Sequence, residues 1–280
     1  MKRKPKILIG IHDALSALLA EKAGFRMLWA SGFGFSTVQG VPDVNLLTLS
    51  ENVDVLRKIL NVTSLPVIAD CDSGYGDIII IQRLVKEYEK IGVKGICIED
   101  NIFPKRCSFY EGVKRELVDV KEHVIKIRVA VDQRSSKNFL IFARTEALIA
   151  GLGQQEALER AMAYAEAGAD AIVIHSKQKT PEEILQFARS WKSKTPLVVI
   201  PTTYFSTPLS VLAEAGIEYV IYANQLVRSA IGAMERTLKA LSLEQTRTKI
   251  DEIIPNLSHV FDLVGVEEVK LLEKKYGNKQ

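Results

Sequence analysis

Short apolar runs rich in β-branched residues recur eight times along the 280-residue chain, and each is followed by a predicted helix. Most of these runs are apolar throughout, which is typical of parallel strands covered on both faces. The alternation predicts a buried parallel sheet built from β–α units. The predicted strands are residues 7–11, 27–30, 67–70, 95–98, 139–143, 171–174, 197–200 and 219–222.

Four of the junctions between a helix and the next strand resemble one another. KAGFRMLWAS, KIGVKGICIED, EAGADAIVIHS and EAGIEYVIYAN each place a glycine where the helix ends. We expect Gly24, Gly92, Gly168 and Gly216 to adopt the left-handed conformation, in which a Cβ is costly. Eight strands with this repeated unit predict an α/β fold of the (β/α)₈ TIM-barrel type, and a doubly wound parallel sheet is the alternative.

Composition narrows the class of protein and of partner. The chain is 47% hydrophobic and 25% charged, which excludes a disordered chain. A net charge of +3 gives no broad field for nucleic acid or a membrane surface, so we expect a small-molecule partner. The three cysteines, Cys71, Cys97 and Cys107, are widely spaced and form no CxxC motif. This spacing argues against a disulfide framework or a zinc site and predicts reduced thiols.

The two ends of the chain lead to further expectations. The apolar run 7–11 is too short for a signal peptide and is interrupted by His12 and Asp13. No run approaches the length of a membrane span, so we expect a soluble cytoplasmic protein. After the last strand we expect a helix over 225–241, a charged break and further helical segments to Tyr276. The apolar residues within 253–264 predict that this part packs on the barrel or on another subunit.

We therefore expect a single barrel domain over residues 1–280, with 242–280 as a C-terminal helical tail. In barrels of this type the active site is built at the carboxyl ends of the strands. The residues that follow the predicted strands are unusually polar. In chain order they are His12 and Asp13, Ser31 and Gly32, Asp70 and Asp72, Glu99 and Asp100, Arg144 and Glu146, His175 and Ser176, Thr202 and Thr203, and Asn224 and Gln225.

Three of these residues are candidate metal ligands. Asp70, Asp72 and Glu99 follow neighbouring strands, and three carboxylates that face one mouth repel one another unless a cation lies between them. Oxygen ligands without histidine or cysteine favour Mg²⁺, with Mn²⁺ as the alternative. The glycines of ADCDSGYGD let the backbone approach a ligand. The competing interpretation is that these are solvated loop acids or salt-bridge partners.

Candidate anion-binding groups follow the second, fifth and sixth strands. Arg144 and His175 would face the metal across the mouth, and arginine offers a planar fork for phosphoryl or carboxylate oxygens. The competing interpretation pairs Arg144 with Glu146 and makes His175 a core histidine. The turn WASGFGFS offers a nest of backbone amides suited to a carboxylate. Those amides belong to Ser31, Gly32 and Phe33.

A long polar segment between Asp100 and Leu117 is a candidate lid. Its sequence is NIFPKRCSFYEGVKRE. Lys105, Cys107 and Ser108 would be carried over a bound substrate if the segment closes. A solvated charged loop is the competing interpretation.

Taken in order, these motifs resemble the phosphoenolpyruvate mutase and isocitrate lyase superfamily, and within it the branch that acts on phosphonopyruvate. The resemblance extends from GIHDALSALLAEKAGF to IYANQLVRSAIGA, almost the whole chain. Several motifs together carry it, whereas any one would be weak. The most specific are WASGF, GVPDVN with Asp43, ADCDSGYGD, IEDNIFPK, ARTEALIAGLG, IHSK and VIPTTYF.

The resemblance implies a (β/α)₈ barrel whose eighth helix is exchanged between subunits of a homodimer or homotetramer. It implies Mg²⁺ near Asp70, Asp72 and Glu99, partly through water. It also implies a 2-oxo acid phosphonate as substrate. The residues implied to bind its carboxylate are Ser31, Gly32 and Phe33, and those implied to bind its phosphonyl group are Arg144, His175 and Ser108. Trp29 is a further predicted substrate-binding residue. Asp43 and Lys105 are implied to lie close to the reaction centre.

The activity implied by the resemblance depends on the lid. ALIAGLGQQEA and IHSKQKTPEEIL look like phosphonopyruvate hydrolase, which cleaves the carbon–phosphorus bond to give pyruvate and phosphate. Phosphoenolpyruvate mutases carry Glu-Asp-Lys and a lid Asn-Ser pair, whereas this chain has Asn101 in place of the lysine and Cys107 in place of the asparagine. We therefore expect hydrolysis, with the mutase reaction as the alternative.

Two further alternatives remain. Isocitrate and methylisocitrate lyases have a lid Lys-(Lys or Arg)-Cys-Gly-His, and Lys105, Arg106 and Cys107 match its first three residues before the sequences diverge. A thiol there could protonate an enolate after carbon–carbon cleavage. The other alternative is a barrel that binds ligand without turning it over.

Overall fold

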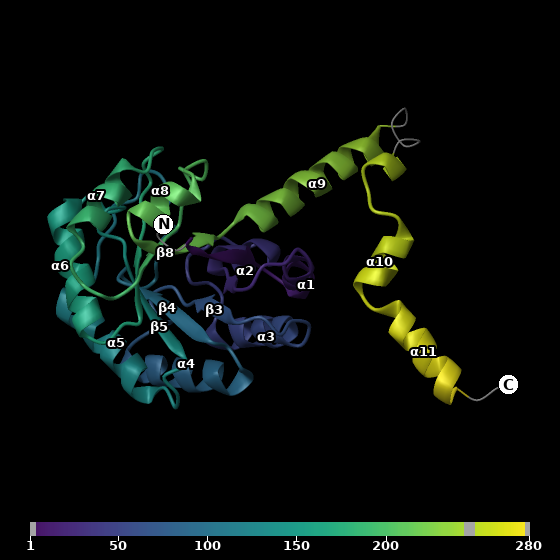
Figure 1. The fold of residues 1–280 in the computed structure, drawn as a ribbon, viewed down its shortest axis with the longest axis horizontal. Coiled ribbons are helices and arrows are strands. Elements are labelled where there is room, and N and C mark those ends of the chain that lie inside the picture. Colours follow the sequence, from purple (N-terminus) through teal and green to yellow (C-terminus); the bar gives the residue numbers. More distant parts are fainter. Residues whose placement is uncertain (1–3, 244–249, 278–280) are drawn as a thin grey trace. The chain divides into compact units, whose positions relative to one another are not determined.

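The computed structural model describes residues 4–243 and 250–277. The chain divides into two compact units, with the boundary between Val227 and Arg228, and each is described by itself. The first unit is a closed barrel of eight strands in chain order, and every strand pairs in parallel with both neighbours (Figure 1). Because β1 pairs with β8, the sheet has no edge, and the doubly wound alternative is excluded.

All eight predicted strands are present, with ends that differ from the prediction by at most two residues. They are β1 (Lys6–Ile11), β2 (Leu28–Ala30), β3 (Val67–Asp70), β4 (Gly95–Glu99), β5 (Leu140–Thr145), β6 (Ala171–Ile174), β7 (Leu197–Val199) and β8 (Ile217–Tyr222). Two strands extend by two residues, β8 at its start and β5 at its end, where backbone pairing with β4 and β6 includes the polar Arg144.

Helices cover the outside of the barrel (Figure 1). They are α1 (Ala14–Lys22), α2 (Gly32–Val38), α3 (Leu49–Leu60), α4 (Ile78–Ile91), α5 (Val120–Gln133), α6 (Gly153–Glu166), α7 (Glu182–Ser190) and α8 (Leu209–Glu214). Side chains cap the first turn of several of these helices by accepting hydrogen bonds from backbone amides. Asp77, for example, accepts from two amides of α4. The four predicted glycines have φ between 84° and 101°, which confirms the left-handed conformation at these helix ends.

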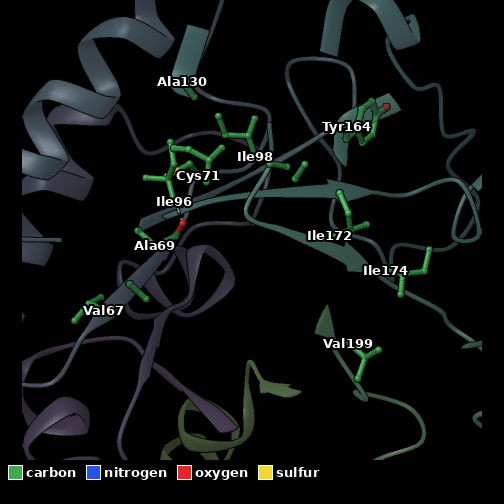
Figure 2. Packing of buried hydrophobic residues seen from close by; sticks show 14 of the residues in the cluster. Val67, Ala69, Cys71, Ile96, Ile98, Ala130, Tyr164, Ile172, Ile174 and Val199 are labelled. Carbon is green, nitrogen blue, oxygen red and sulfur yellow. Dashed lines mark hydrogen bonds between the residues drawn. The ribbon is translucent and has the colours of Figure 1, made fainter. Parts of the chain in front are cut away.

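Alternation along the strands divides the core into two layers. One set of side chains packs between strands and helices, including Val67, Ala69, Ile96, Ile98 and Ile172 (Figure 2). The other set fills the barrel interior, and its members include Leu8, Trp29, Ile68, Cys97, Phe142, Val173, Val198 and Ile221. Both layers are almost wholly apolar, so the barrel interior is a packed core that closes the floor of the mouth.

The second unit contains most of α9 (Gln225–Ser242), then α10 (Leu257–Leu263) and α11 (Val266–Tyr276). The helix predicted over 225–241 and the later helical segments are therefore present. The charged break falls on residues 244–249, outside the described residues. The division between the units lies within α9. The single barrel domain with a tail from residue 242 stays a prediction. In the described part of the chain, no helix combines the length and apolar character needed to cross a membrane.

Candidate active site

The barrel interior changes from apolar to polar at the carboxyl ends of the strands. Since side chains two residues apart point to the same side of a strand, each interior apolar residue predicts which later residue faces the mouth. The apolar and polar partners are Ile68 and Asp70, Cys97 and Glu99, Phe142 and Arg144, and Val173 and His175. The four polar side chains are thus brought to one end of the barrel by the pleat of β3 to β6.

Two of the predicted metal ligands converge on the start of α2. A Cβ built on Gly32 would lie 3.2 Å from Asp72 Oδ1 and 3.7 Å from the Asp70 carboxyl carbon. Glycine at this position lets the first turn of α2 approach both carboxyl groups. Asp70 and Asp72 therefore share one small space with the backbone of Gly32.

The loops around this space hold a strained backbone. In the described residues, the non-glycine residues with positive φ are Asn45, Asp72 and Tyr75, at 60°, 50° and 61°. Such conformations are uncommon outside glycine and cluster at functional sites. Tyr75 anchors the loop after β3, because its side chain packs against the core and its hydroxyl lies 3.4 Å from that of Tyr88.

Lys105 of the lid reaches the space shared by Asp70, Asp72 and the Gly32 backbone, which we call the acidic space. Its Nζ lies 2.7 Å from Asp43 Oδ2 and 2.9 Å from Asp72 Oδ1, and its side chain is only 7% exposed. Burial alone would lower the pKa of Lys105, but Asp72 and Asp43 outweigh it and raise that pKa well above the usual range. The lid lysine is therefore a fixed cation beside the predicted reaction centre.

Asn45 is a site residue that sequence reasoning missed. Its Nδ2 donates to Asp72 Oδ2 at 2.8 Å, and its Oδ1 accepts from the backbone amide of Lys105 at 2.6 Å. An amide side chain can do both because it carries a donor and an acceptor on one carbon. The available signal was its place two residues after Asp43 in GVPDVN, in a residue type that tolerates positive φ.

The predicted anion-binding residues meet around Glu146. Arg144 Nε donates to Glu146 Oε1 at 2.8 Å, and Ser108 Oγ donates to Glu146 Oε2 at 2.6 Å. Arg144 Nη2 also donates to Ser108 Oγ at 2.9 Å, and His175 Nδ1 lies 3.2 Å from Glu146 Oε1. Residues of the lid, β5 and the end of β6 thus form one buried polar cluster. Arg144 pairs with Glu146, as the competing interpretation expected, and also lies beside His175 and Ser108, as the predicted anion site requires.

One ring nitrogen of His175 is buried and makes no hydrogen bond within the described part of the chain. His175 is 3% exposed, and its Nε2 has no hydrogen-bond partner among the described residues. Burial lowers the pKa of His175, while Glu146 opposes that shift. Phe109 of the lid packs its edge against the ring at 5.5 Å between centroids. A buried, unpartnered ring nitrogen at the strand end is available to a ligand oxygen.

The site carries more negative than positive charge. Five carboxyl groups face it, from Asp43, Asp70, Asp72, Glu99 and Glu146, against the two cations of Lys105 and Arg144. Desolvation raises the pKa of both Asp70 and Asp72. The neighbouring carboxylates act in the same direction, while Lys105 opposes the shift at both groups and Arg144 opposes it at Asp70. These oxygen donors and their excess charge suit a hard divalent cation.

The acids are not preassembled as a three-ligand cage. Among the described residues, no group of three His, Cys, Asp or Glu side chains is arranged to hold a metal ion. Two of the three predicted ligands form ion pairs with cations of the chain: Lys105 Nζ lies 2.9 Å from Asp72 Oδ1, and Arg144 Nε lies 3.2 Å from Glu99 Oε2. The assignment of Asp70, Asp72 and Glu99 as metal ligands stays a prediction.

The turn after β2 differs in one respect from expectation. The Ser31 amide donates to the Ile11 carbonyl at 3.1 Å, because the β1–β2 ladder continues one residue past β2. The prediction that the Ser31 amide is open to a ligand is therefore wrong. Gly32 and Phe33 occupy the first turn of α2, where backbone amides have no partner within a helix. Trp29 lies wholly buried in the barrel interior, and its predicted contact with substrate stays untested.

The lid is a closed loop with a short antiparallel neck. Asn101 pairs with Leu117, and the Val118 amide donates to the Asp100 carbonyl at 2.9 Å. Asn101 Nδ2 also donates to Glu99 Oε1 at 2.8 Å. Cys107 lies between Lys105 and Ser108, and burial raises the pKa of its thiol. The predicted lid residues therefore lie over the mouth.

Several polar strand-end residues serve the scaffold instead. The Asp100 carboxyl group accepts from Thr145 Oγ1 at 2.9 Å, the Glu146 amide at 2.8 Å and Tyr164 Oη at 2.8 Å. It thereby joins β4 to β5 and α6. Ser176 donates to Glu183 of α7. Neither side chain makes a contact with the acidic space or with Glu146 in the structure, other than the Asp100 bond to the Glu146 backbone.

Comparison with known proteins agrees with this geometry. The chain matches the family model for phosphoenolpyruvate phosphomutase over residues 1–242. It is 42% identical over 268 residues to a phosphonopyruvate hydrolase of Variovorax sp. (strain Pal2), covering 95% of this chain and 92% of that one.

Solved structures show the same likeness. A phosphoenolpyruvate phosphomutase from Streptomyces platensis subsp. rosaceus has a TM-score of 0.95 at 39% identity, covering 99% of this chain and 96% of that one. A phosphonopyruvate hydrolase in complex with oxalate and Mg²⁺ has a TM-score of 0.91 at 40% identity, covering 98% and 95%. The chain belongs to the phosphoenolpyruvate phosphomutase family and is an enzyme of that family.

Proposed function

We propose that this enzyme hydrolyses the carbon–phosphorus bond of phosphonopyruvate to give pyruvate and phosphate. The observation that carries the proposal is the thiol of Cys107, which lies in the lid between Lys105 and Ser108 where mutases carry an amide. A thiol is a weak hydrogen-bond donor, so it holds a migrating phosphoryl group less firmly than an amide does. The 42% identity to a phosphonopyruvate hydrolase supports the same choice.

The acidic space is proposed to hold Mg²⁺ through Asp70, Asp72 and Glu99, partly by way of water. Their oxygen donors and the excess of negative charge fit a hard divalent cation. When bound, Mg²⁺ supplies Lewis-acid stabilisation of the negative charge that develops on the enolate oxygen. Lys105 adds a fixed positive charge beside the same space.

The two ends of the substrate are proposed to bind on opposite sides of the mouth. The carboxylate would accept hydrogen bonds from the first-turn amides of Gly32 and Phe33, at the positive end of α2. The phosphonyl oxygens would accept from Arg144, Ser108 and the unpartnered nitrogen of His175. This orientation leaves phosphorus open to attack from the side away from the leaving carbon.

The chemical step transfers phosphorus from carbon to water. The water oxygen forms a bond to phosphorus while the carbon–phosphorus bond breaks, and the electron pair of that bond enters the pyruvate enolate. Asp43 is proposed to order the water and take its proton, since its carboxylate is buried and held by Lys105 at 2.7 Å. The enolate then takes up a proton to give pyruvate. Closure of the lid by Lys105 excludes bulk water.

Two other reactions are consistent with the same residues. Phosphoenolpyruvate mutase activity would return the phosphoryl group to the enolate oxygen before water captures it. A carbon–carbon lyase would use Cys107 as an acid, and the raised pKa of this thiol keeps it protonated at neutral pH. The lid sequence after Cys107 departs from the lyase pattern, which places that reaction third.

Phosphorus NMR of the enzyme with phosphonopyruvate and Mg²⁺ tests the proposal. We expect inorganic phosphate to appear with metal and to be absent when EDTA is added. A phosphoenolpyruvate signal would identify a mutase and overturn the assignment. An unchanged spectrum, together with cleavage of a 2-substituted malate, would identify a lyase.

We also propose that the enzyme is a homodimer or homotetramer. The second unit leaves many large apolar side chains exposed, among them Leu257, Phe261 and Val264. Exposed apolar surface of this kind marks an interaction site in soluble proteins. The resemblance implies that the eighth helix of the barrel is exchanged between subunits, and an interface between copies would cover these side chains.

A further inference from the structure

Arg115 lies on the returning arm of the lid and is not among the residues proposed to touch substrate. Its guanidinium group donates to three backbone carbonyls of the same loop. Nη1 donates to Arg106 O at 3.0 Å, while Nη2 donates to Cys107 O at 2.6 Å and to Tyr110 O at 3.3 Å. The side chain is partly buried, and of the three bonds the one to Cys107 O is partly shielded from water.

These carbonyls belong to the part of the lid that enters the active site. Lys105 and Ser108 both point into the mouth, where they bond Asp43 and Glu146. The peptide groups of Arg106 and Cys107 lie between them in the chain. Their carbonyls accept hydrogen bonds from Arg115. The bonds from Arg115 thus fix the backbone that carries Lys105 and Ser108.

The chemistry of the contact favours arginine. Three acceptors converge on one side chain, and a guanidinium group offers five N–H donors in a planar fork. A lysine ammonium is a single point on a flexible stem and cannot match the three directions equally. The Tyr110 amide donates to Cys107 O at 3.0 Å, so this carbonyl accepts from both the turn and Arg115.

We infer that Arg115 is a positioning residue of the lid, which sets the turn from Arg106 to Tyr110 so that Lys105 and Ser108 reach the active site together. The effect on catalysis rests on the function proposed above. The effect on lid order does not, because it follows from the hydrogen bonds of the loop itself. A lid held less firmly would place its two side chains less often in the productive geometry.

Lys114 provides a matched control. It is the neighbouring residue on the same arm and carries the same charge, but it is exposed and pairs with Glu116 at 2.7 Å. Replacing Lys114 by methionine removes a lid cation without touching the carbonyls of the turn. Comparing Arg115→Met with Lys114→Met therefore distinguishes loss of the guanidinium hydrogen bonds from loss of one positive charge on the lid.

Hydrogen exchange followed by mass spectrometry tests lid order directly, in the full-length enzyme with Mg²⁺ and oxalate as the probe. We expect Arg115→Met to speed exchange of the peptide covering residues 105–111 by about tenfold or more. Lys114→Met should match the wild type there. Barrel peptides, such as those of β4 and β5, should be unchanged in both variants. Equal protection of 105–111 in wild type and Arg115→Met would overturn the inference, as would an equal loss in the two variants.

Kinetics provide a separate readout. With phosphonopyruvate we expect Arg115→Met to lower kcat/KM by about tenfold or more, and Arg115→Lys to give an intermediate loss. Wild-type lid protection and activity in Arg115→Lys would show that the fork is not needed and would overturn the inference. If the wild type itself leaves phosphonopyruvate intact while the exchange effect is present, the proposed function fails and the role of Arg115 in the lid stands.

Discussion

Cys107 is the residue on which the choice between hydrolysis and phosphoryl return depends. We expect Cys107→Asn to produce phosphoenolpyruvate from phosphonopyruvate, because an amide in this position can donate a firm hydrogen bond to the migrating group. Phosphorus NMR would detect the new signal beside inorganic phosphate. Cys107→Ala removes the thiol without adding an amide and is the control. No phosphoenolpyruvate in the asparagine variant would remove the support that the lid gives to the hydrolase assignment.

At the same scale, the sequence indicated which residue types gather at the mouth but not how they pair. Asp43 and Lys105 were both expected near the reaction centre, and they form an ion pair in the structure. Asn45 was missed because its two contacts, to Asp72 and to the Lys105 backbone, join loops that are distant in the chain. Such pairs depend on closure of the barrel and of the lid, and residue spacing alone contains no information about them.

At the scale of elements, the contact of α5 with α6 contains a buried histidine. The His123 ring packs edge-on against Tyr164 of α6, with centroids 4.5 Å apart, and is wholly buried. Burial, with Lys126 and Arg160 nearby, lowers the pKa of His123 from 6.5 to about 3. The folded protein therefore keeps this ring neutral where the unfolded chain would take up a proton.

This difference predicts how the free energy of unfolding depends on pH. The contribution of His123 is fully present above pH 6.5 and is lost as the pH falls toward 3, at about 1.4 kcal/mol per unit. Urea unfolding at pH 7.5 and pH 5 should show the wild type losing about 2 kcal/mol more than His123→Phe, which has no titrating ring. Equal losses in the two proteins would show that His123 titrates normally in the folded state.

The elements themselves were largely predictable, because uniformly apolar runs and helix-ending glycines are local signals. The ends of the strands were less predictable. β4 and β5 extend through the polar Glu99 and Arg144, because the backbone ladder continues after the apolar run stops. The lid could be identified as a long polar segment. Its neck, formed by Asn101 and Leu117, required the structure.

At the scale of the whole molecule, the second unit predicts self-association. Leu257, Phe261 and Val264 lie at helical spacing in and just after α10 and are 70%, 48% and 61% exposed. The second unit taken by itself leaves this apolar surface in water, whereas an interface between copies would remove it from water. Light scattering should therefore give a native mass of two or four chains.

A paired substitution tests whether this surface makes the contact. We expect Leu257→Asp combined with Phe261→Asp to lower the native mass, because each places an unpaired charge in the proposed interface. Ser258→Asp adds a charge to the same helix, at an exposed polar position, and should leave the mass unchanged. Circular dichroism would show whether the barrel stays folded in each variant. A wild-type mass of one chain, or an unchanged mass in the paired variant, would show that α10 does not join the subunits.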